Sequence, residues 1–327
     1  MENISALKSL LKEAFHKRKD LFTDTKTTAY RMFNGFCEGC RDFSIDRYGD
    51  TVVILWMQKK AAPDFDLKQA LCGLCLDCIP GIRNVLFKNR FSTEPDEKKG
   101  ILLSGKMAAG KIREWGIEYP VNLQINKDCG FYLDSALLRK WLLENSAGKR
   151  VLNTFAYTGS LGDAAYAGCA LSVTQTDLNH NYLSIRHSGQ EYLLGDFFHV
   201  AASLRRSERL FDIIILDPPF FANAGRNAKV NQAQDAAALI NKVRPLAAHN
   251  AKIVIVNNAL FLSGRDFLHQ LGKLCGDYLH IGEIIPVPES FYGFSKIDEK
   301  TLPADPSPFN HPTKIVILDV LRKDERK

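Results

Sequence analysis

The second part of the chain, from about residue 123 onward, alternates short apolar runs with longer segments of helical spacing. The apolar runs predict seven strands, at Arg150–Thr154, Ser172–Thr176, Tyr192–Leu194, Phe211–Leu216, Lys252–Val256, His280–Pro286 and Lys314–Arg322. Because helical stretches separate most of these runs, the pattern predicts an α/β fold with a doubly wound, largely parallel sheet. Ligands of such sheets bind beyond the carboxyl ends of the strands, so the residues that follow each strand are the functional candidates.

The first part of the chain has a different pattern, typical of a smaller α+β unit. Apolar positions at helical spacing predict a helix over Ile4–Lys19, and a second helix over Leu67–Cys78. Two short strands around the Gly49-Asp50 turn and a strand over Arg83–Lys88 complete the unit. We therefore predict a basic leader helix at 1–25, a small α+β domain at 26–120 that is a candidate for RNA binding, and an α/β domain at 121–327.

Charge narrows the class of protein only slightly. The net charge is +6 with a pI near 8.8, and basic residues gather at His16–Lys19 and Lys106–Arg113, among other places. Such groups are compatible with a phosphate-bearing partner, and equally with ordinary solvated faces. The aliphatic runs are too short to cross a bilayer, and the first twenty residues lack a signal sequence, so we expect a cytoplasmic protein without a membrane partner.

The eight cysteines have two explanations. Cys72, Cys75 and Cys78 have the spacing of metal ligands. The same spacing on the predicted helix, however, places three small apolar side chains on one buried face. We favour packing, and expect reduced thiols and no metal site.

The turns after the first three strands of the α/β domain carry candidate ligand-binding residues. The first strand is followed by a single glycine, Gly159, so the three-glycine pattern of dinucleotide-binding proteins is absent. The second strand ends at Asp177, whose carboxylate suits two ribose hydroxyls or, alternatively, a helix cap. Asp196 follows the third strand, where it could hold an adenine amino group with Phe197 covering the ring, or simply cap the next helix.

The turn after the fourth strand is the most specific feature of the sequence. The strand Phe211–Leu216 runs into Asp217-Pro218-Pro219-Phe220. Two prolines remove two backbone donors and stiffen the turn, which leaves the Asp217 carboxylate and the Pro218 carbonyl as fixed acceptors. These acceptors can hold an amine of a planar base while Phe220 stacks on its face. We predict Asp217, Pro218 and Phe220 as the catalytic residues of a transferase, although such a turn is usually only a loop.

Together these strand ends resemble a class I S-adenosylmethionine-dependent methyltransferase with an antiparallel last strand. More narrowly, the chain from about Thr27 resembles the bacterial large-subunit ribosomal RNA methyltransferases that modify a cytosine C5 or a guanine N7. The matching stretches are Ala29–Gly35, Ser44–Gly49, Gly130–Asp134, Asn153–Gly159 and Asp217–Pro219. The resemblance implies S-adenosylmethionine as the cofactor and RNA, with ribosomal RNA favoured, as the partner. It implies that the cofactor pocket is lined by Phe131, Asp134, Asn153, Phe155, Tyr157, Thr158, Gly159, Asp177 and Asp196.

The chain also departs from this family. An N-terminal RNA-binding domain of the PUA type is often present in the family, whereas only the basic helix precedes the α+β unit here. In the motif Leu133-Asp134-Ser135-Ala136 the family's arginine is missing, and only 19 residues separate Asp177 from Asp196. The family places a cysteine after the fifth strand, where Ala259 stands in this sequence. Cytosine C5 is not nucleophilic and needs that thiolate to add to C6, so the sequence favours a guanine nitrogen.

Three other functions remain open from the sequence. The chain could methylate a small molecule or a protein, or cytosine C5 of RNA after all. It could also be a non-catalytic RNA-binding protein with a degenerate methyltransferase fold.

The segment before the last strand, with Asn310, His311 and Lys314, could form a lid over the acceptor or a plain surface loop. The protein could act as a monomer or a homodimer.

Overall fold

The computed structural model describes residues 4–59, 63–182, 189–219, 232–259, 262–293 and 308–326. The chain forms two compact units, each taken here by itself. The first consists of Met1–Ala136 and Pro288–Lys296, and the second of Leu137–Val287 and Ile297–Lys327. Among the described residues, no helix is both long and apolar enough to span a membrane.

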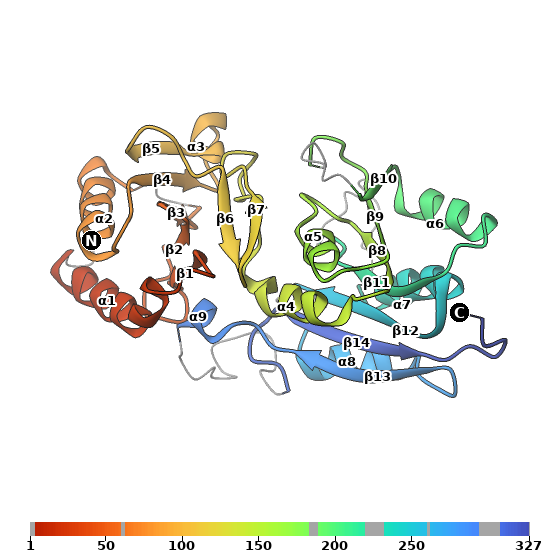
Figure 1. Cartoon of the computed structure of the whole chain (residues 1–327). Coiled ribbons are helices and arrows are strands. Elements are labelled where there is room, and N and C mark those ends of the chain that lie inside the picture. Colours follow the sequence, from red (N-terminus) through yellow and green to blue (C-terminus); the bar gives the residue numbers. More distant parts are fainter. Residues whose placement is uncertain are drawn as a thin grey trace. The chain divides into compact units, whose positions relative to one another are not determined.

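The first unit is built on a five-stranded sheet in the order β1-β2-β3-β4-β5 (Figure 1). Its elements are α1 (Ile4–Lys17), η1 (Lys19–Phe22), β1 (Ala29–Phe33), β2 (Phe43–Tyr48), β3 (Thr51–Trp56), α2 (Phe65–Cys78), β4 (Asn84–Asn89), α3 (Pro95–Lys99), β5 (Ile101–Ser104), the hairpin β6 (Lys111–Glu114) and β7 (Ile117–Pro120), η2 (Leu133–Ser135) and the returning α9 (Glu289–Tyr292). Only β3 and β4 pair in parallel. The two predicted helices and the predicted β2–β3 hairpin are confirmed.

The leader helix α1 is part of the core of this unit. Leu7, Leu11 and Phe15 are buried in the same apolar cluster as Cys72 and Cys75 of α2. Burial raises the pKa of the Cys75 thiol above its usual range, as expected for a thiol packed in an apolar cluster. Among the described residues, no group of three or more His, Cys, Asp and Glu could hold a metal ion.

The first unit extends beyond the boundary at residue 120 that the sequence suggested, and the reason lies in Lys88. This lysine is fully buried, and its Nζ donates hydrogen bonds to the carbonyl oxygens of Leu123, Asn126 and Asp128. The rings of Tyr119 and Phe131 also pack, with centroids 5.3 Å apart. These contacts tie the chain after β7 to the first unit as far as Ala136.

The second unit is built on a seven-stranded sheet in the order β10-β9-β8-β11-β12-β14-β13 (Figure 1). Its elements are α4 (Ala136–Asn145), β8 (Arg150–Thr154), α5 (Ser160–Ala167), β9 (Ser172–Asp177), β10 (Glu191–Leu194), α6 (Phe197–Arg206), β11 (Phe211–Leu216), α7 (Gln232–Val243), η4 (Arg244–Leu246), β12 (Ala247–Asn257), α8 (Gly264–Gly272), β13 (Leu279–Ile285) and β14 (Lys314–Val320).

The order and direction of these strands confirm the predicted fold. Strands β10, β9, β8, β11 and β12 pair in parallel, and the last strand, β14, is antiparallel to both of its neighbours. Apolar side chains of α6, α7 and α8 share one buried cluster with Ile214 of β11 and Ile253 of β12. All seven predicted strands are present, and β11, a buried parallel strand, is the nearly continuous aliphatic run that this type of sheet favours.

Candidate active site

The carboxyl edge of the second unit's sheet brings most of the predicted residues together. Because β9, β8, β11 and β12 are parallel neighbours, their carboxyl ends meet at one edge. Asp177 ends β9, the Asn153–Gly159 turn leaves β8, Asp217 follows β11 and Ala259 follows β12. Asp196 follows β10 at the same edge. A single ligand at this edge can therefore meet residues from five strands.

The turn after β8 has an unusual backbone. Phe155 and Tyr157 have positive φ values of 55° and 52°, and Gly159 has φ of 93°. Left-handed backbone at a residue other than glycine or asparagine is uncommon, and it gathers at ligand-binding turns. The Tyr157 and Thr158 side chains are half-buried, and the Tyr157 ring meets Tyr182 edge-on with centroids 4.6 Å apart. The turn is thus tightly shaped, as a cofactor loop needs to be.

A buried chain of amides supports this turn from below. Asn153 is fully buried, and its Nδ2 donates to Oε1 of Gln175 over 3.0 Å. Gln175 Nε2 donates to Gln190 Oε1 at 2.5 Å, and Gln190 Nε2 donates to Asp163 Oδ1 at 3.0 Å. The Oδ1 atom of Asn153 is buried and has no hydrogen-bond partner within the described residues. A buried acceptor of this kind is costly unless something else satisfies it.

Two glycines make room for this amide chain. A Cβ atom at Gly159 would come within 2.9 Å of Gln175 Nε2, and one at Gly162 within 2.4 Å of Gln175 Cδ. Any side chain at either position would displace the buried Gln175 amide. The sequence indicated Gly159 but not Gly162, Gln175, Gln190 or Asp163, because a polar network that spans strands has no local signature.

Asp177 holds the β8 turn. Its Oδ2 accepts a hydrogen bond from the Tyr157 backbone N–H at 2.8 Å, and its Oδ1 accepts one from the Asn179 N–H at 2.8 Å. A carboxylate has about four acceptor positions, so each oxygen can accept one further bond. The remaining positions suit two vicinal hydroxyls of a ribose, and that role of Asp177 stays a prediction.

Asp196 caps helix α6. Its Oδ1 accepts from the backbone N–H groups of Phe198 and His199, at 2.9 and 3.2 Å. The next residue, Phe197, is buried and stacks on Phe155 with ring centroids 4.8 Å apart. This stack joins the turns after β8 and β10. Whether Asp196 also contacts an adenine stays a prediction.

The Asp217 turn begins at a firmly anchored strand end. Leu216 is fully buried, whereas Asp217 and Pro218 are half-buried and Pro219 is exposed. The Thr154 hydroxyl donates to the Ile215 carbonyl oxygen at 2.7 Å, which ties β8 to β11 just before the turn. Phe220 lies outside the described residues. The turn thus begins at the same edge of the sheet as the β8 turn and Asp177.

Ala259 occupies a buried position after β12. It is fully buried, and its N–H donates to Asn257 Oδ1 at 2.9 Å. Its carbonyl oxygen accepts from Nζ of the buried Lys314 at 2.9 Å, and burial lowers the pKa of that lysine to about 8. Lys314 is thus occupied in holding this turn. Asn310 likewise bonds the backbone of Val287 through both its amide atoms.

No described cysteine lies beside the Asp217 turn in the second unit. Cys169 follows α5 and Cys275 follows α8, both where the chain returns to the amino ends of the strands. The methyl group of Ala259 offers no nucleophile at the position where the resembling family has a thiol. Within the described part of this unit, covalent addition by a thiolate has no candidate at the carboxyl edge.

Two predicted cofactor residues belong to the first unit. Phe131 is buried, and its carbonyl oxygen accepts from the Tyr48 hydroxyl at 3.1 Å. It follows Gly130, whose φ of 72° is left-handed, and Asp134 lies half-buried in η2. The motif is well ordered within its own unit, and the cofactor role of both residues stays a prediction.

Comparisons with known proteins bear on the chemistry of this edge. The family model described as S-adenosylmethionine-dependent methyltransferase matches residues 77–298. The chain is similar to a Bacillus subtilis protein named "Putative ribosomal RNA large subunit methyltransferase YwbD", at 29% identity over 89% of this chain and 77% of that protein. It is also similar to the ribosomal RNA large subunit methyltransferase K/L of Shewanella pealeana, at 27% identity over 80% of this chain but only 36% of that longer protein.

Two solved structures have the same fold. One is described as a "putative sam-dependent methyltransferase from Streptococcus mutans", at 24% identity and a TM-score of 0.81. The other is described as the "crystal structure of SMU.776, a putative methyltransferase complexed with SAH", at 25% identity and the same TM-score. Each comparison covers 98% of this chain and 82% of the other chain. A tRNA m1G37 methyltransferase from M. jannaschii has the same fold at 14% identity and a TM-score of 0.54, covering 96% of this chain and 79% of that one.

Proposed function

This chain belongs to the S-adenosylmethionine-dependent methyltransferases, and from that premise we propose that it methylates a guanine nitrogen of large-subunit ribosomal RNA. The predicted enzyme class and cofactor are confirmed by the family. The choice of ribosomal RNA is supported by the names of the two relatives, YwbD and K/L. We further propose a cytoplasmic enzyme, since ribosomal RNA is its acceptor.

The residues at the carboxyl edge fit the cofactor. Asp177 retains acceptor positions for two hydroxyls, and the left-handed turn after β8 lets the backbone approach a ligand closely. The buried Asn153 Oδ1 is an acceptor still without a partner among the described residues. S-adenosylmethionine supplies a methyl group on a sulfonium, which leaves as a thioether when a nucleophile attacks in line.

The choice of a nitrogen acceptor rests on one observation: Asp217 follows β11, and Ala259, where the resembling family has a cysteine, follows the neighbouring strand β12. A guanine nitrogen carries a lone pair and attacks directly, so the chain needs only to position it and to exclude water. Asp217 and the Pro218 carbonyl would accept hydrogen bonds from the N–H groups of the base. For an exocyclic amine, Asp217 would also be the nearest group to take up the proton that is lost. Phe220, by the same proposal, would stack on the ring.

The proposal is tested by remethylation. Protein-free ribosomal RNA from cells that lack this protein would be incubated with the purified full chain and radiolabelled S-adenosylmethionine. We expect label in the large-subunit RNA and none in the same RNA from parental cells, where the site is already modified. Label only in added protein or small-molecule extracts, and none in RNA, would contradict the proposal and favour a methyltransferase that acts on a protein or a small molecule.

The non-catalytic alternative has its own test. Titration calorimetry of the full chain with SAH measures cofactor binding without any acceptor. We expect saturable binding with one site per chain. An absence of heat and of binding would rule out the enzyme and leave a degenerate methyltransferase fold.

A further inference from the structure

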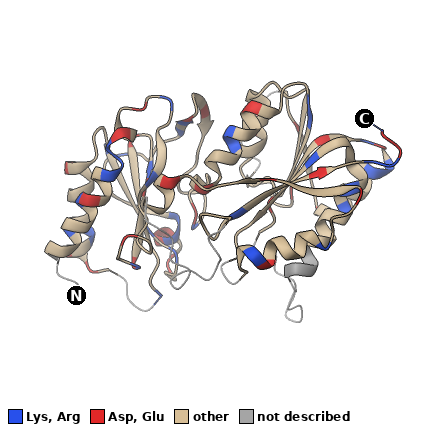
Figure 2. Ribbon diagram, turned by 90° about the horizontal axis from the view of Figure 1, so that it is seen from below, with Lys and Arg blue, Asp and Glu red and all other residues tan. Residues whose placement is uncertain are grey.

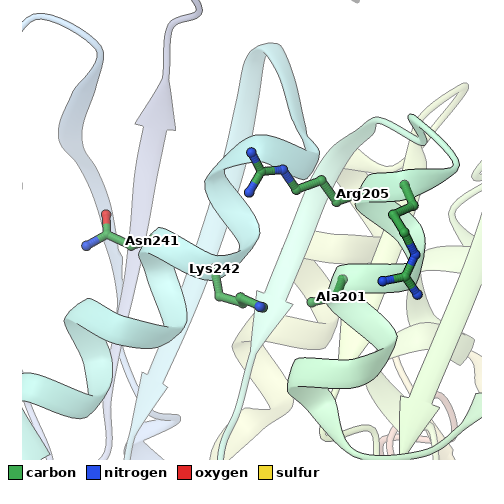
Figure 3. A pocket seen from close by; sticks show the side chains of 6 residues that line it. Ala201, Arg205, Asn241 and Lys242 are labelled. Atoms are coloured by element: carbon green, nitrogen blue, oxygen red, sulfur yellow. The ribbon is translucent and has the colours of Figure 1, made fainter.

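Lysine and arginine residues gather in the second unit near the C-terminus (Figure 2). A hollow of about 380 Å³ lies between the last turns of α6 and α7 (Figure 3). It is lined by Ala201, Ala202, Arg205, Arg206, Asn241 and Lys242. A second hollow, of about 320 Å³, shares Arg205 and is also lined by Glu208, Arg209, Leu210, Pro245, Arg322 and Arg326, so one carboxylate lies among its arginines. We call these two hollows together the basic edge.

The basic edge lies at the amino ends of the parallel strands. Helix α6 begins next to Asp196 at the carboxyl edge and ends at Arg206, and α7 ends at Val243, just before β12 begins. The second hollow is also lined by Leu210 and Pro245, which precede β11 and β12. A six-residue strand spans about 20 Å, so the basic edge is on the order of 20 Å from Asp217. It cannot hold the base that is methylated.

Most of the charge at the first hollow is not neutralised. Elsewhere in this region arginines have acidic partners: Arg209 pairs with Glu191 at 2.7 Å, and Asp324 pairs with both Arg322 and Arg326. Arg205, Arg206 and Lys242, in contrast, form no ion pair with any residue that the structure describes. A cation in the last turn of a helix interacts favourably with the helix dipole, and this explains why each of the three residues is basic. It does not account for their convergence from two helices on one hollow.

The chemistry of the lining selects the kind of ligand. Guanidinium and ammonium groups bind phosphate oxygens strongly. No aromatic side chain lines either hollow, although the exposed ring of Phe198 lies beside Lys242, whose Nζ is 5.9 Å from the ring centroid. The two hollows are adjacent, because Arg205 lines both of them. Two adjacent hollows suit a chain of phosphates better than one small anion. We propose that the basic edge binds the sugar-phosphate backbone of the RNA substrate, away from the nucleotide that is methylated.

This inference rests on the proposed RNA substrate and adds a second place on the enzyme where that substrate would bind. Contacts to phosphates position an RNA without reading its sequence. The enzyme would therefore hold its substrate at two places on the second unit, with the reacting base at the carboxyl edge and a flanking strand or stem at the basic edge. The affinity of the enzyme for RNA should then fall as the salt concentration rises, whereas the rate of methyl transfer in the bound complex should not depend on the basic edge.

The test compares two double variants that each remove two positive charges from the full chain. The first is Arg205→Ala with Lys242→Ala, at the basic edge. The second is Lys140→Ala with Lys273→Ala, whose side chains are exposed and line neither hollow. Fluorescence anisotropy with a labelled RNA stem-loop of arbitrary sequence gives the Kd between about 50 and 200 mM salt.

We expect the basic-edge variant to bind roughly tenfold more weakly, and its slope of log K against log salt to fall by about 2. The matched control should stay close to the parental protein, and SAH binding should be unchanged in both variants. RNA binding by the parental chain with equal Kd and slope in the two variants would overturn the basic edge alone. No RNA binding by the parental chain would overturn the proposed RNA substrate as well.

Discussion

The two edges of the seven-stranded sheet are made by the same strands but are built for different work. The carboxyl edge carries Asp177, Asp196 and Asp217, and a turn with left-handed residues after β8. The amino edge carries arginines and lysines at the last turns of α6 and α7. The first edge is shaped by fixed backbone and buried amides, and the second by exposed charge. By the proposals above, one sheet would position the reacting base at its carboxyl edge and hold the RNA backbone at its amino edge, so variants at the two edges should affect different steps.

The largest effect is expected at the Asp217 turn. Asp217→Ala removes the acceptor that would hold the target base, so we expect kcat to fall by about a hundredfold or more. SAH affinity measured by calorimetry should stay within about twofold, because Asp217 is not among the predicted cofactor residues. Asp217→Asn, which keeps one acceptor oxygen, should retain more activity. Full activity of the alanine variant would show that the acceptor site lies elsewhere.

A smaller effect is expected at the end of β9. Asp177→Ala removes two charged acceptors and the anchor of the Tyr157 N–H. A hydrogen bond to a charged group is worth about 1.5–3 kcal/mol, so the net loss of one such bond to the ribose should lower SAH affinity by roughly 10- to 100-fold. RNA affinity at the amino edge should be unchanged. Unaltered SAH binding would leave Asp177 with a purely structural role in the turn.

The buried amides beneath the turn can be tested through glycine. Gly162→Ala places a methyl group against Gln175, and we expect the free energy of unfolding to fall by about 1–3 kcal/mol in urea titrations. SAH affinity should fall with it. Gly272→Ala is the matched control, because a Cβ atom there meets nothing within 4 Å. A Gly162→Ala protein as stable as the parental one would mean that the amide network tolerates displacement.

The smallest effect is a pH dependence at Lys314. Burial lowers its pKa to about 8, whereas a lysine in the unfolded chain keeps its usual pKa of about 10.4. Between these values the unfolded state binds more protons, so the lysine destabilises the protein below pH 8 and less so as pH rises. The stability of the parental chain relative to Lys314→Met should therefore increase from about pH 8 to about pH 10. A constant difference across that interval would contradict the assigned burial.

The sequence predicted the strand ends well, and side-chain partners poorly. The predicted strand Phe211–Leu216 matches β11, because an aliphatic run between polar turns is typical of a buried strand in a parallel sheet. Arg18 was counted within a basic patch, but it is buried against Glu38, with two hydrogen bonds of 2.9 and 2.8 Å. Its partner lies twenty residues away, so local charge could not reveal it. The Asn153–Gln175 contact was equally invisible, since it depends on the register of β8 and β9.

The atom that receives the methyl group is the most direct test of the proposed nitrogen acceptor. Large-subunit RNA methylated by the full chain in vitro would be digested to nucleosides and identified by mass spectrometry against synthetic standards. With Ala259 in place of a nucleophile and Asp217 holding the base, we predict a guanosine methylated on nitrogen. A 5-methylcytidine product would contradict the nitrogen-acceptor proposal, because that reaction needs a thiolate, and the described residues of the second unit place none at the carboxyl edge.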